Sequence, residues 1–526
     1  MSQETPYSYD EVPYESKPFP QTHPDRLAVM ARLFGMKPKA VSRCRVLELG
    51  CAAGGNLIPM AESLPNSRFV GVELSARQVA DAEDLIGIVG LKNIEFRHLS
   101  ITDVDKDFGE FDYIICHGVY SWVPDAVQEK ILEICHTNLA PDGVAYVSYN
   151  TYPGWHFRGM IRDMMLYHTK QLPTPQARAA QARALLDFLS QSVPAESNAY
   201  GIMLKNELDI LRNQGDSYLI HEHLEDANRP LYFYEFADRA YQHGLQYLGE
   251  PVLSGMLTSN FTKQVADTLR QVSNDIIRTE QYMDFLRNRT FRQTLLCRKE
   301  VSLKRNLGPS DMKGFWIESA AKPVSENPEI FSTRPEQYRN QAGHTFTTIN
   351  PIVKAAFTYL AELWPQTVSF DELLNHARER TALASNRDAD ALGLEAEVLG
   401  YDLLTAYTAN LVELHFQGHE FMTNVSARPM ASPLARGQAK KGNMVTTRRH
   451  ERLTLDPFNI QLLLLLDGKR APKVILDELV KLAKAGTLTV QKDGKPVSQY
   501  ESLRNILSDF MENSLQSFAR AALLVG

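Results

Sequence analysis

The residues with the clearest potential for chemistry lie in the stretch VLELGCAAGGN at 46–56, where small residues follow an apolar run. Glu48 lies two residues before Gly50, and Ala52 and Gly54 follow at alternate positions. Glycine permits φ > 0 and lets a ligand approach the backbone, and a helix that starts there offers unpaired N–H groups. The pattern therefore predicts a turn between a strand and a helix that binds an anion or a nucleoside.

Two cofactors would suit such a turn. A dinucleotide-binding turn has the pattern Gly-x-Gly-x-x-Gly, and its middle glycine lets the backbone approach a pyrophosphate. Here Gly50, Ala52 and Gly55 occupy those places, so the middle glycine is missing. S-adenosyl-L-methionine has no pyrophosphate but carries cationic sulfonium and ammonium groups, which the Glu48 carboxylate can neutralise or position. No Gly-Lys-Ser/Thr follows, which excludes a P-loop, and S-adenosyl-L-methionine is the expected cofactor.

Three further positions suit the adenosine part of this cofactor. Glu73 ends the next apolar run, VGVELS, roughly 20 residues after Gly50, near the spacing of an acid that accepts hydrogen bonds from ribose hydroxyls. Leu99 and Ser100 follow a third run, NIEFRH, at the place where such folds hold adenine. A plain transition from strand to loop is the alternative for Leu99 and Ser100.

The elements that would position these residues alternate between strand and helix patterns from about 44 to 150. This alternation predicts an α/β fold with a doubly wound, Rossmann-like sheet. A helical domain and a mixed C-terminal domain, for which a winged helix is one option, follow it. The expected boundaries are an N-terminal arm or lid at 1–41, a cofactor-binding domain at 42–155, a helical domain at 156–303, a connector at 304–340 and a C-terminal domain at 341–526.

Composition limits the class of protein. The 526 residues carry a net charge of -7, which argues against a dedicated nucleic-acid binder. The five cysteines are scattered without a CxxC pair, so neither a disulfide framework nor a zinc site is expected. The polar N-terminus does not resemble a secretory signal, and the aliphatic run at 460–466 is too short to span a bilayer. We therefore expect a soluble, cytoplasmic protein without membrane insertion.

Taken together, the turn, Glu73 and the strands around them resemble a class I S-adenosylmethionine-dependent methyltransferase over about 42–150. Other stretches are similar to bacterial proteins in which this domain precedes a methyltransferase regulatory domain. That group includes protein lysine methyltransferases that act on outer-membrane proteins. The stretches are YDEVPY at 9–14, FPQTHPD at 19–25, YNTYPGW at 149–155, YLIHEHL at 218–224 and PLYFYEF at 230–236.

The resemblance implies methyl transfer to a lysine of a protein substrate, a helical region that can support a homodimer, and a central cavity between domains. It also implies that Glu48, Gly50, Ala52, Gly54 and Glu73 line the cofactor pocket. Ala52 departs from the general methyltransferase pattern, which often has glycine there, and its methyl group narrows the turn.

The candidates for catalysis follow from the needs of a lysine nucleophile. A lysine amine must lose its proton before it reacts, since its unperturbed pKa is about 10.4. Tyr120 and Tyr152 are favoured because they lie at predicted strand ends and a hydroxyl can orient an amine. His117 is a candidate proton acceptor. The alternative for these residues is a role in packing or in loop hydrogen bonding.

No metal site is expected. His221 and His223, in HEH, and His415 and His419, in HFQGH, lack the HExxH spacing and an evident third ligand. Two functions remain open beside protein methylation, namely methyl transfer to a small molecule and a catalytically silent scaffold that binds S-adenosylmethionine. The size of the helical and C-terminal parts favours a macromolecular or bulky substrate.

Overall fold

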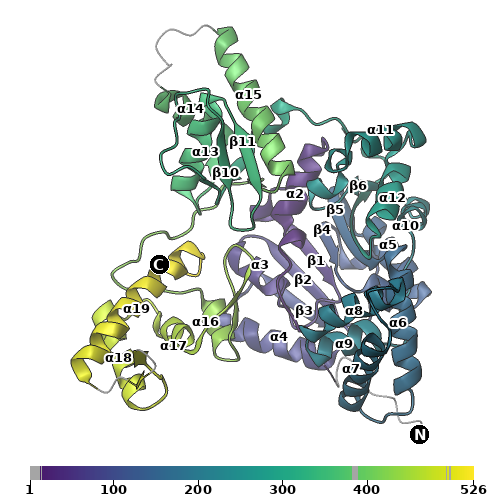
Figure 1. Ribbon diagram of the computed structural model, residues 1–526, viewed down its shortest axis with the longest axis horizontal. Coiled ribbons are helices and arrows are strands. Elements are labelled where there is room, and N and C mark those ends of the chain that lie inside the picture. Colours follow the sequence, from purple (N-terminus) through teal and green to yellow (C-terminus); the bar gives the residue numbers. More distant parts are fainter. Residues whose placement is uncertain (1–11, 13–14, 382–388, 493–494, 497–498) are drawn as a thin grey trace.

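The computed structural model describes the chain apart from residues 1–11, 13–14, 382–388, 493–494 and 497–498 (Figure 1). Of the YDEVPY stretch at 9–14, only Val12 lies among the described residues.

A seven-stranded sheet forms the centre of the molecule, with the strand order β3-β2-β1-β4-β5-β7-β6. Strands β1 to β5 are parallel to one another, and β7 is antiparallel to both of its neighbours. This confirms the doubly wound, Rossmann-like sheet predicted from the sequence. The strands are β1 (Arg45–Leu49), β2 (Arg68–Glu73), β3 (Ile94–His98), β4 (Phe111–Cys116), β5 (Leu139–Asn150), β6 (Leu245–Gly249) and β7 (Phe291–Arg298).

Helices cover both faces of this sheet, because apolar side chains alternate between the faces along each strand. In β1, Val46 packs on one face while Leu47 and Leu49 pack on the other. The helices on the Val46 face are α2 (Pro24–Leu33), α3 (Leu57–Ser63) and α4 (Ala76–Val89), and those on the other face are α5 (Asp125–Thr137) and α10 (Phe233–Gln242).

Local sequence signals set the ends of helix α4, which follows the second strand. The Ser75 side chain accepts a hydrogen bond from the backbone N–H of Gln78, which satisfies a donor that the first turn leaves unpaired. Gly90 ends the helix in the left-handed region at φ 83°, where glycine is favoured. The start of α4 is thus fixed directly beside Glu73.

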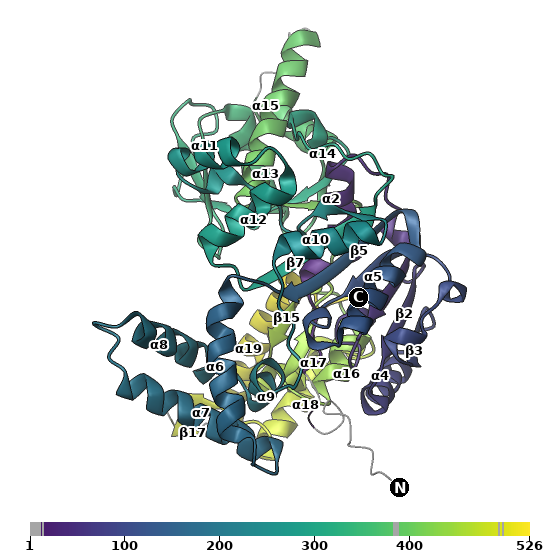
Figure 2. The same cartoon turned by 90° about the vertical axis from the view of Figure 1, so that its right-hand side faces the viewer.

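The last two strands of the sheet come from the region that was expected to form a helical domain. Strands β6 and β7 flank α11 (Lys263–Val272) and α12 (Ile276–Arg287), so the sheet continues well past the boundary expected at 155. Between β5 and β6 a helical layer lies beside the sheet (Figure 2). Its helices are α6 (Gly154–Thr169), α7 (Pro175–Ser192), α8 (Ala199–Arg212) and α9 (Asp216–His223).

A middle domain occupies residues 304–421. Its first three strands, β8 (Trp316–Glu318), β9 (Lys322–Pro323) and β10 (Glu336–Arg339), lie in the segment expected to be a connector at 304–340. They pair with later strands of the same domain, which the connector pattern did not reveal. The remaining elements are β11 (Thr345–Thr348), α13 (Pro351–Leu363), β12 (Val368–Ser369), α14 (Phe370–Arg380), α15 (Ala389–Thr408) and β13 (Glu413–His415).

Helix α2 belongs to the segment expected to be an arm or lid at 1–41, but it is a core element. Leu27 and Met30 are fully buried in a hydrophobic cluster that joins the sheet to Phe357 of the middle domain. The shared cluster fixes the middle domain against the methyltransferase sheet. Only the segment before α2 remains a candidate for a cover over a pocket.

The C-terminal domain, the yellow-green part of Figure 1, contains residues between Ala431 and Leu524 that form a hydrophobic core of their own. Among the described residues of the chain, no helix is long and apolar enough to cross a membrane. The elements of the domain are α16 (Pro433–Ala439), β14 (Met444–Thr446), β15 (Arg452–Thr454), α17 (Pro457–Leu465), α18 (Pro472–Lys484), β16 (Gln491–Lys492), β17 (Lys495–Pro496) and α19 (Tyr500–Arg520).

A buried charge cluster ties helix α12 to the sheet. Arg292 of β7 is fully buried, and its guanidinium lies 2.7 to 2.9 Å from the carboxylates of Glu250, Glu280 and Asp284. A buried cation of this kind cannot be removed alone, since its partners would be left as unpaired charges in a low dielectric.

We therefore expect Arg292→Ala to lower the free energy of unfolding by about 3–5 kcal/mol. Arg270→Ala is the matched control, because that arginine is largely exposed and pairs with Asp267 at the surface, where such a pair contributes about 0–1 kcal/mol. Urea titration of both variants measures the difference. Equal losses in the two variants would contradict the role assigned to the cluster.

Candidate functional site

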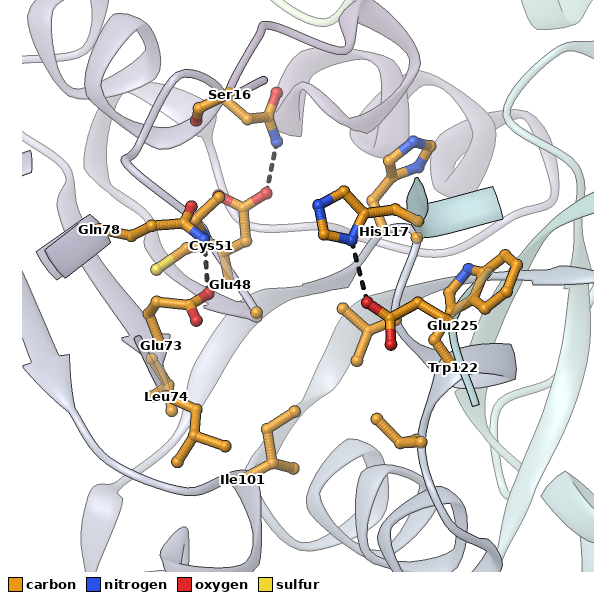
Figure 3. Close-up of a pocket in the computed structure, with 18 of the residues that line it drawn as sticks. Ser16, Glu48, Cys51, Glu73, Leu74, Gln78, Ile101, His117, Trp122 and Glu225 are labelled. Carbon is orange, nitrogen blue, oxygen red and sulfur yellow. Dashed lines mark hydrogen bonds and ion pairs between the residues drawn. The ribbon is translucent and has the colours of Figure 1, made fainter. Parts of the chain in front are cut away.

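A cavity of about 620 Å³ lies at the carboxyl ends of the parallel strands, where ligands bind in open α/β sheets. Its walls come from the turn after β1, from the ends of β2 to β5, from the segment before α2, and from helices α6 and α9. The sheet and the helical layer therefore meet around one space. Glu48 and Glu73 lie on one side of this space in Figure 3, and Trp122 and Glu225 lie on the other.

The turn after β1 is left-handed at three positions. Gly50, Ala52 and Gly54 have φ values of 69°, 49° and 75°. A Cβ at Gly54 would lie 2.6 Å from the Phe96 ring and 2.7 Å from Ile58 Cδ1, so only glycine fits there. Ala52 adopts the same region with a side chain, which stores some backbone strain. The departure noted at Ala52 is therefore tolerated in the geometry that glycine usually provides.

Glu48 lies at the end of β1, and only one of its two carboxyl oxygens has a hydrogen-bond partner among the described residues. Its Oε1 accepts a hydrogen bond of 2.7 Å from the Asn56 amide. Its Oε2 is buried and has no hydrogen-bond partner in the part of the chain that the structure describes. Burial raises the pKa of Glu48 to about 8, with the Asn56 hydrogen bond opposing this shift and the charge of Glu73 adding to it. An unpartnered carboxyl oxygen of this kind suits a cationic group such as an ammonium.

Glu73 lies at the end of β2 and organises the loops around it. Its two carboxylate oxygens accept hydrogen bonds of 2.9 Å from the backbone N–H groups of Ala52 and Ser75. Leu99 and Ser100 line the same cavity. The cofactor candidates Glu48, Gly50, Ala52 and Glu73 line it as well. Gly54 does not line the cavity, because it packs against Phe96 and Ile58 on the other side of the turn.

Several cavity residues were missed by the sequence analysis. Leu74 and Ile101 each follow a predicted residue by one position and add apolar surface to the cavity wall (Figure 3). An apolar residue directly after a candidate polar residue could have identified them. The other missed residues come from elements far apart in the sequence. Phe19, Asn56, Tyr218 and Glu222 lie in stretches that the sequence analysis singled out, but their residue types alone did not indicate a place in the cavity. The missed residues from these distant elements include Ser16, Phe19, Asn56, Gln78, Asn150, Arg158, Tyr218, Glu222, Glu225 and Phe291.

The segment before α2 lines the cavity and contacts the cofactor turn. The Gly55 N–H donates a hydrogen bond of 2.7 Å to Ser16 Oγ, and the Phe19 N–H donates to Asn56 Oδ1 at 2.9 Å. A Cβ at Gly55 would lie 2.4 Å from the Ser16 carbonyl carbon, so this close approach depends on glycine. The His221 ring nitrogen Nε2 lies 2.7 Å from the Val12 carbonyl oxygen and connects the same segment to α9.

Of the three predicted catalytic residues, His117 alone lines the cavity. Its Nδ1 lies 2.8 Å from the Tyr146 hydroxyl, and its ring packs against Phe19 with centroids 3.9 Å apart. Burial lowers the pKa of His117 to about 3, with a small contribution from Lys17. A group with so low a pKa is a poor acceptor for the proton of an ammonium, so the geometry does not support the predicted role as a base.

The two predicted tyrosines lie outside the cavity lining. Tyr120 is fully buried and packs against Phe236, with ring centroids 5.3 Å apart, in the core beneath the sheet edge. Burial raises the pKa of Tyr120 to about 12. Tyr152 stacks on His156 at 4.0 Å and contacts Tyr232. Both placements favour packing, and Trp122 of the same region lines the cavity.

A second cluster of titratable groups lies where α2 meets the middle and C-terminal domains. Asp25, His415 and His419 present atoms at metal-ligand spacing, as do Glu318, Glu413 and His415. Burial alone would lower the pKa of His415, but its hydrogen bond to Asp25 and the nearby Glu318 carboxylate raise it to about 9. A protonated His415 between two carboxylates accounts for this arrangement as an ion-pair network between domains.

Comparison with known proteins assigns this site to a family. Residues 47–145 match a methyltransferase domain, residues 215–298 a predicted methyltransferase regulatory domain, and residues 427–523 the PKMT C-terminal winged helix domain. An uncharacterized protein of Rickettsia prowazekii is 39% identical over 98% of this chain and 93% of its own length. The structure of PKMT2 from Rickettsia typhi in complex with AdoHcy is 31% identical, with a TM-score of 0.87 over 98% of this chain and 100% of that one. The chain belongs to the PKMT family.

As a PKMT-family member, the chain is an S-adenosylmethionine-dependent methyltransferase, and the resemblance read from its sequence is confirmed. The C-terminal domain is the winged helix that the sequence left as one option. A shorter match, 28% identical over 20% of this chain and 36% of the other, is trans-aconitate 2-methyltransferase of Deinococcus radiodurans. S-adenosylmethionine fits the site, because the unpartnered Glu48 oxygen suits its ammonium and the left-handed turn leaves the backbone open to a ligand.

The turn leads to a prediction about two neighbouring positions. Gly54→Ala introduces a Cβ into a filled space at positive φ, so we expect loss of stability and more than about tenfold weaker binding of S-adenosylhomocysteine. Ala52→Gly relieves left-handed strain, and its unfolding free energy should stay within about 1 kcal/mol of the parent. Thermal unfolding and calorimetric titration measure both. A Gly54→Ala variant with unchanged stability and unchanged S-adenosylhomocysteine affinity would show that the turn does not require glycine at this position.

Glu48 leads to a prediction about pH. Its folded pKa of about 8 lies above the ordinary value of 4.5, so the folded protein keeps a proton that the unfolded chain releases between these values. Stability of the parent should therefore fall as pH rises through this window, by a few kcal/mol. Glu48→Gln cannot ionise and should become more stable relative to the parent from pH 5 to pH 8. Urea unfolding at the two pH values tests this, and identical slopes with pH would refute it.

Proposed function

We propose that this PKMT-family methyltransferase transfers methyl groups to lysine side chains of a protein substrate. The observation that carries the proposal is the single cavity shared by the cofactor turn and by α6 and α9 of the helical layer. In this proposal Glu48, Gly50, Ala52, Glu73, Leu99 and Ser100 contact the donor, and Gly54 sets the shape of the turn.

The walls of the cavity suit a long alkyl chain that ends in a cation. Phe19, Trp122 and Phe291 offer apolar and aromatic surface to the stem of a lysine. Glu222 offers a carboxylate to its ammonium. When bound, S-adenosylmethionine supplies a methyl group already activated by its sulfonium, so the protein mainly positions and desolvates the nucleophile.

The same proposal includes the class of substrate, the compartment and the oligomeric state of the enzyme. A net charge of -7 fits a protein substrate better than a nucleic acid. The five cysteines are buried free thiols, as a reducing cytoplasm would favour. We also propose a homodimer, for which the exposed apolar residues Phe157, Tyr167 and Phe188 of the helical layer are candidates.

The test is to incubate the protein with a tritiated methyl donor and fractionated bacterial lysate. We expect label in protein bands, and labelled methyl-lysine after acid hydrolysis. Glu73→Ala is the matched control, since the loss of its hydrogen bonds to the turn should abolish donor binding in a calorimetric titration. Label confined to the small-molecule fraction would replace the proposal with a small-molecule methyltransferase, and donor binding without any label would indicate a silent scaffold.

A further inference from the structure

We propose that Glu222 is the residue that receives the ammonium of the target lysine and takes up its proton before methyl transfer. This inference rests on the proposed function and goes beyond it by naming a residue. Glu222 lies near the end of α9, on the part of the cavity wall that faces the donor-binding edge of the sheet. It belongs to the regulatory domain and not to the methyltransferase domain.

The spacing along α9 directs one side of the helix into the cavity. Four residues of this segment line the cavity, namely Tyr218, His221, Glu222 and Glu225. Tyr218 lies three and four residues before His221 and Glu222, and Glu225 lies four and three residues after them, so all four share one side of the segment. Glu222 is thus one of two carboxylates that α9 and the residue positions directly after it bring to this wall. The two carboxylates differ in what they contact.

Glu225 already has a partner, because its Oε1 lies 3.1 Å from the His221 ring nitrogen Nδ1. Glu222 differs, since no hydrogen bond and no ion pair within the described part of the chain ends on its carboxylate. A carboxylate in a cavity wall without a bonding partner has unsatisfied acceptor capacity, and a charged donor is the group that would use it best.

An arginine whose charge acts on the Glu222 carboxyl is already neutralised by another acid. Arg158 of α6 donates to Glu207 Oε1 at 3.0 and 3.1 Å and to the Tyr218 hydroxyl at 3.2 Å. The carboxylate of Glu207 also lies 3.2 Å from a ring nitrogen of His223. Arg158 and Glu207 therefore form a closed pair, and the charge of Glu222 remains available to a cation that enters from outside.

The environment of Glu222 also favours proton uptake. Burial raises the pKa of this carboxyl, while the charges of Arg158, His221 and Lys17 oppose the shift and Glu207 adds to it. These are the charged groups that face it from α6, α9, α8 and the segment before α2. A carboxylate with a raised pKa is a better proton acceptor than the neutral His117, whose pKa is held at about 3.

The proton balance of the step is simple. The lysine ammonium gives one proton to the Glu222 carboxylate, which leaves a neutral amine and a carboxylic acid. The neutral amine is the nucleophile, and the methylated amine carries the positive charge that the sulfonium loses. The Glu222 carboxylic acid returns its proton to water when the product leaves, so no further reactant is required.

The binding test uses Nα-acetyl-lysine methylamide as the probe and its norleucine counterpart, which lacks the amine, as the reference. Both are titrated into the full-length protein saturated with S-adenosylhomocysteine. We expect the parent to prefer the lysine probe, and Glu222→Gln to lose about 10- to 100-fold of that affinity, as for a lost charge-assisted hydrogen bond. Affinity for S-adenosylhomocysteine should stay unchanged, and the unfolding temperature should not fall, because the substitution removes a buried carboxyl whose pKa is raised.

Glu225→Gln is the matched control, because it changes the partnered carboxylate at the same wall and should alter probe affinity less than about threefold. In methylation of the labelled protein fraction, Glu222→Gln should lower kcat/KM by the same 10- to 100-fold. Equal probe affinity in parent and Glu222→Gln, or no preference for lysine over norleucine in the parent, would overturn the inference. If the parent prefers the lysine probe but labels no protein lysine, the proposed function fails while the ammonium site stands.

Discussion

The crowding of two buried carboxylates at one end of the sheet is the constraint on which the site depends. Glu48 and Glu73 end adjacent parallel strands, and both are less than a tenth exposed. The left-handed turn between them supplies an N–H to Glu73, while one oxygen of Glu48 keeps no partner in the described structure. Negative charge in so dry a place is costly without a cation. The open Glu48 oxygen therefore leaves the site suited to a cationic nucleoside.

The regulatory domain is built into the catalytic sheet rather than attached to it. Two strands from the matched region, β6 and β7, complete the sheet, and the buried Arg292 holds helix α12 against them. The same region provides α9, whose side chains form the wall opposite the donor. Helix α9 thus belongs to a region anchored in the sheet, which favours a defined distance between a substrate amine and the methyl donor.

The sheet is joined to the middle and C-terminal domains by a hydrophobic cluster and by buried ion pairs. Helix α2 joins the sheet and the middle domain through a common hydrophobic cluster. Beside it, Asp25, His415 and Glu318 form a buried ionic chain that Arg449 of the C-terminal domain extends. The segment before α2 continues from this junction along the cavity wall, where Ser16 meets the cofactor turn. The shared hydrophobic cluster holds these domains together, and the buried ion pairs determine their relative orientation.

The sequence by itself determined the alternation of strands and helices in the first half, the cofactor turn and the acids at strand ends, because these depend on local spacing and periodicity. It failed for Tyr120 and Tyr152, which lie at strand ends as predicted but do not line the cavity. Only the tertiary structure placed Arg158 and Glu222 beside the donor site, and only it showed that β6 and β7 close the sheet. These contacts join residues far apart in the chain, so their pairing is decided by packing and charge compensation, which no short sequence pattern records.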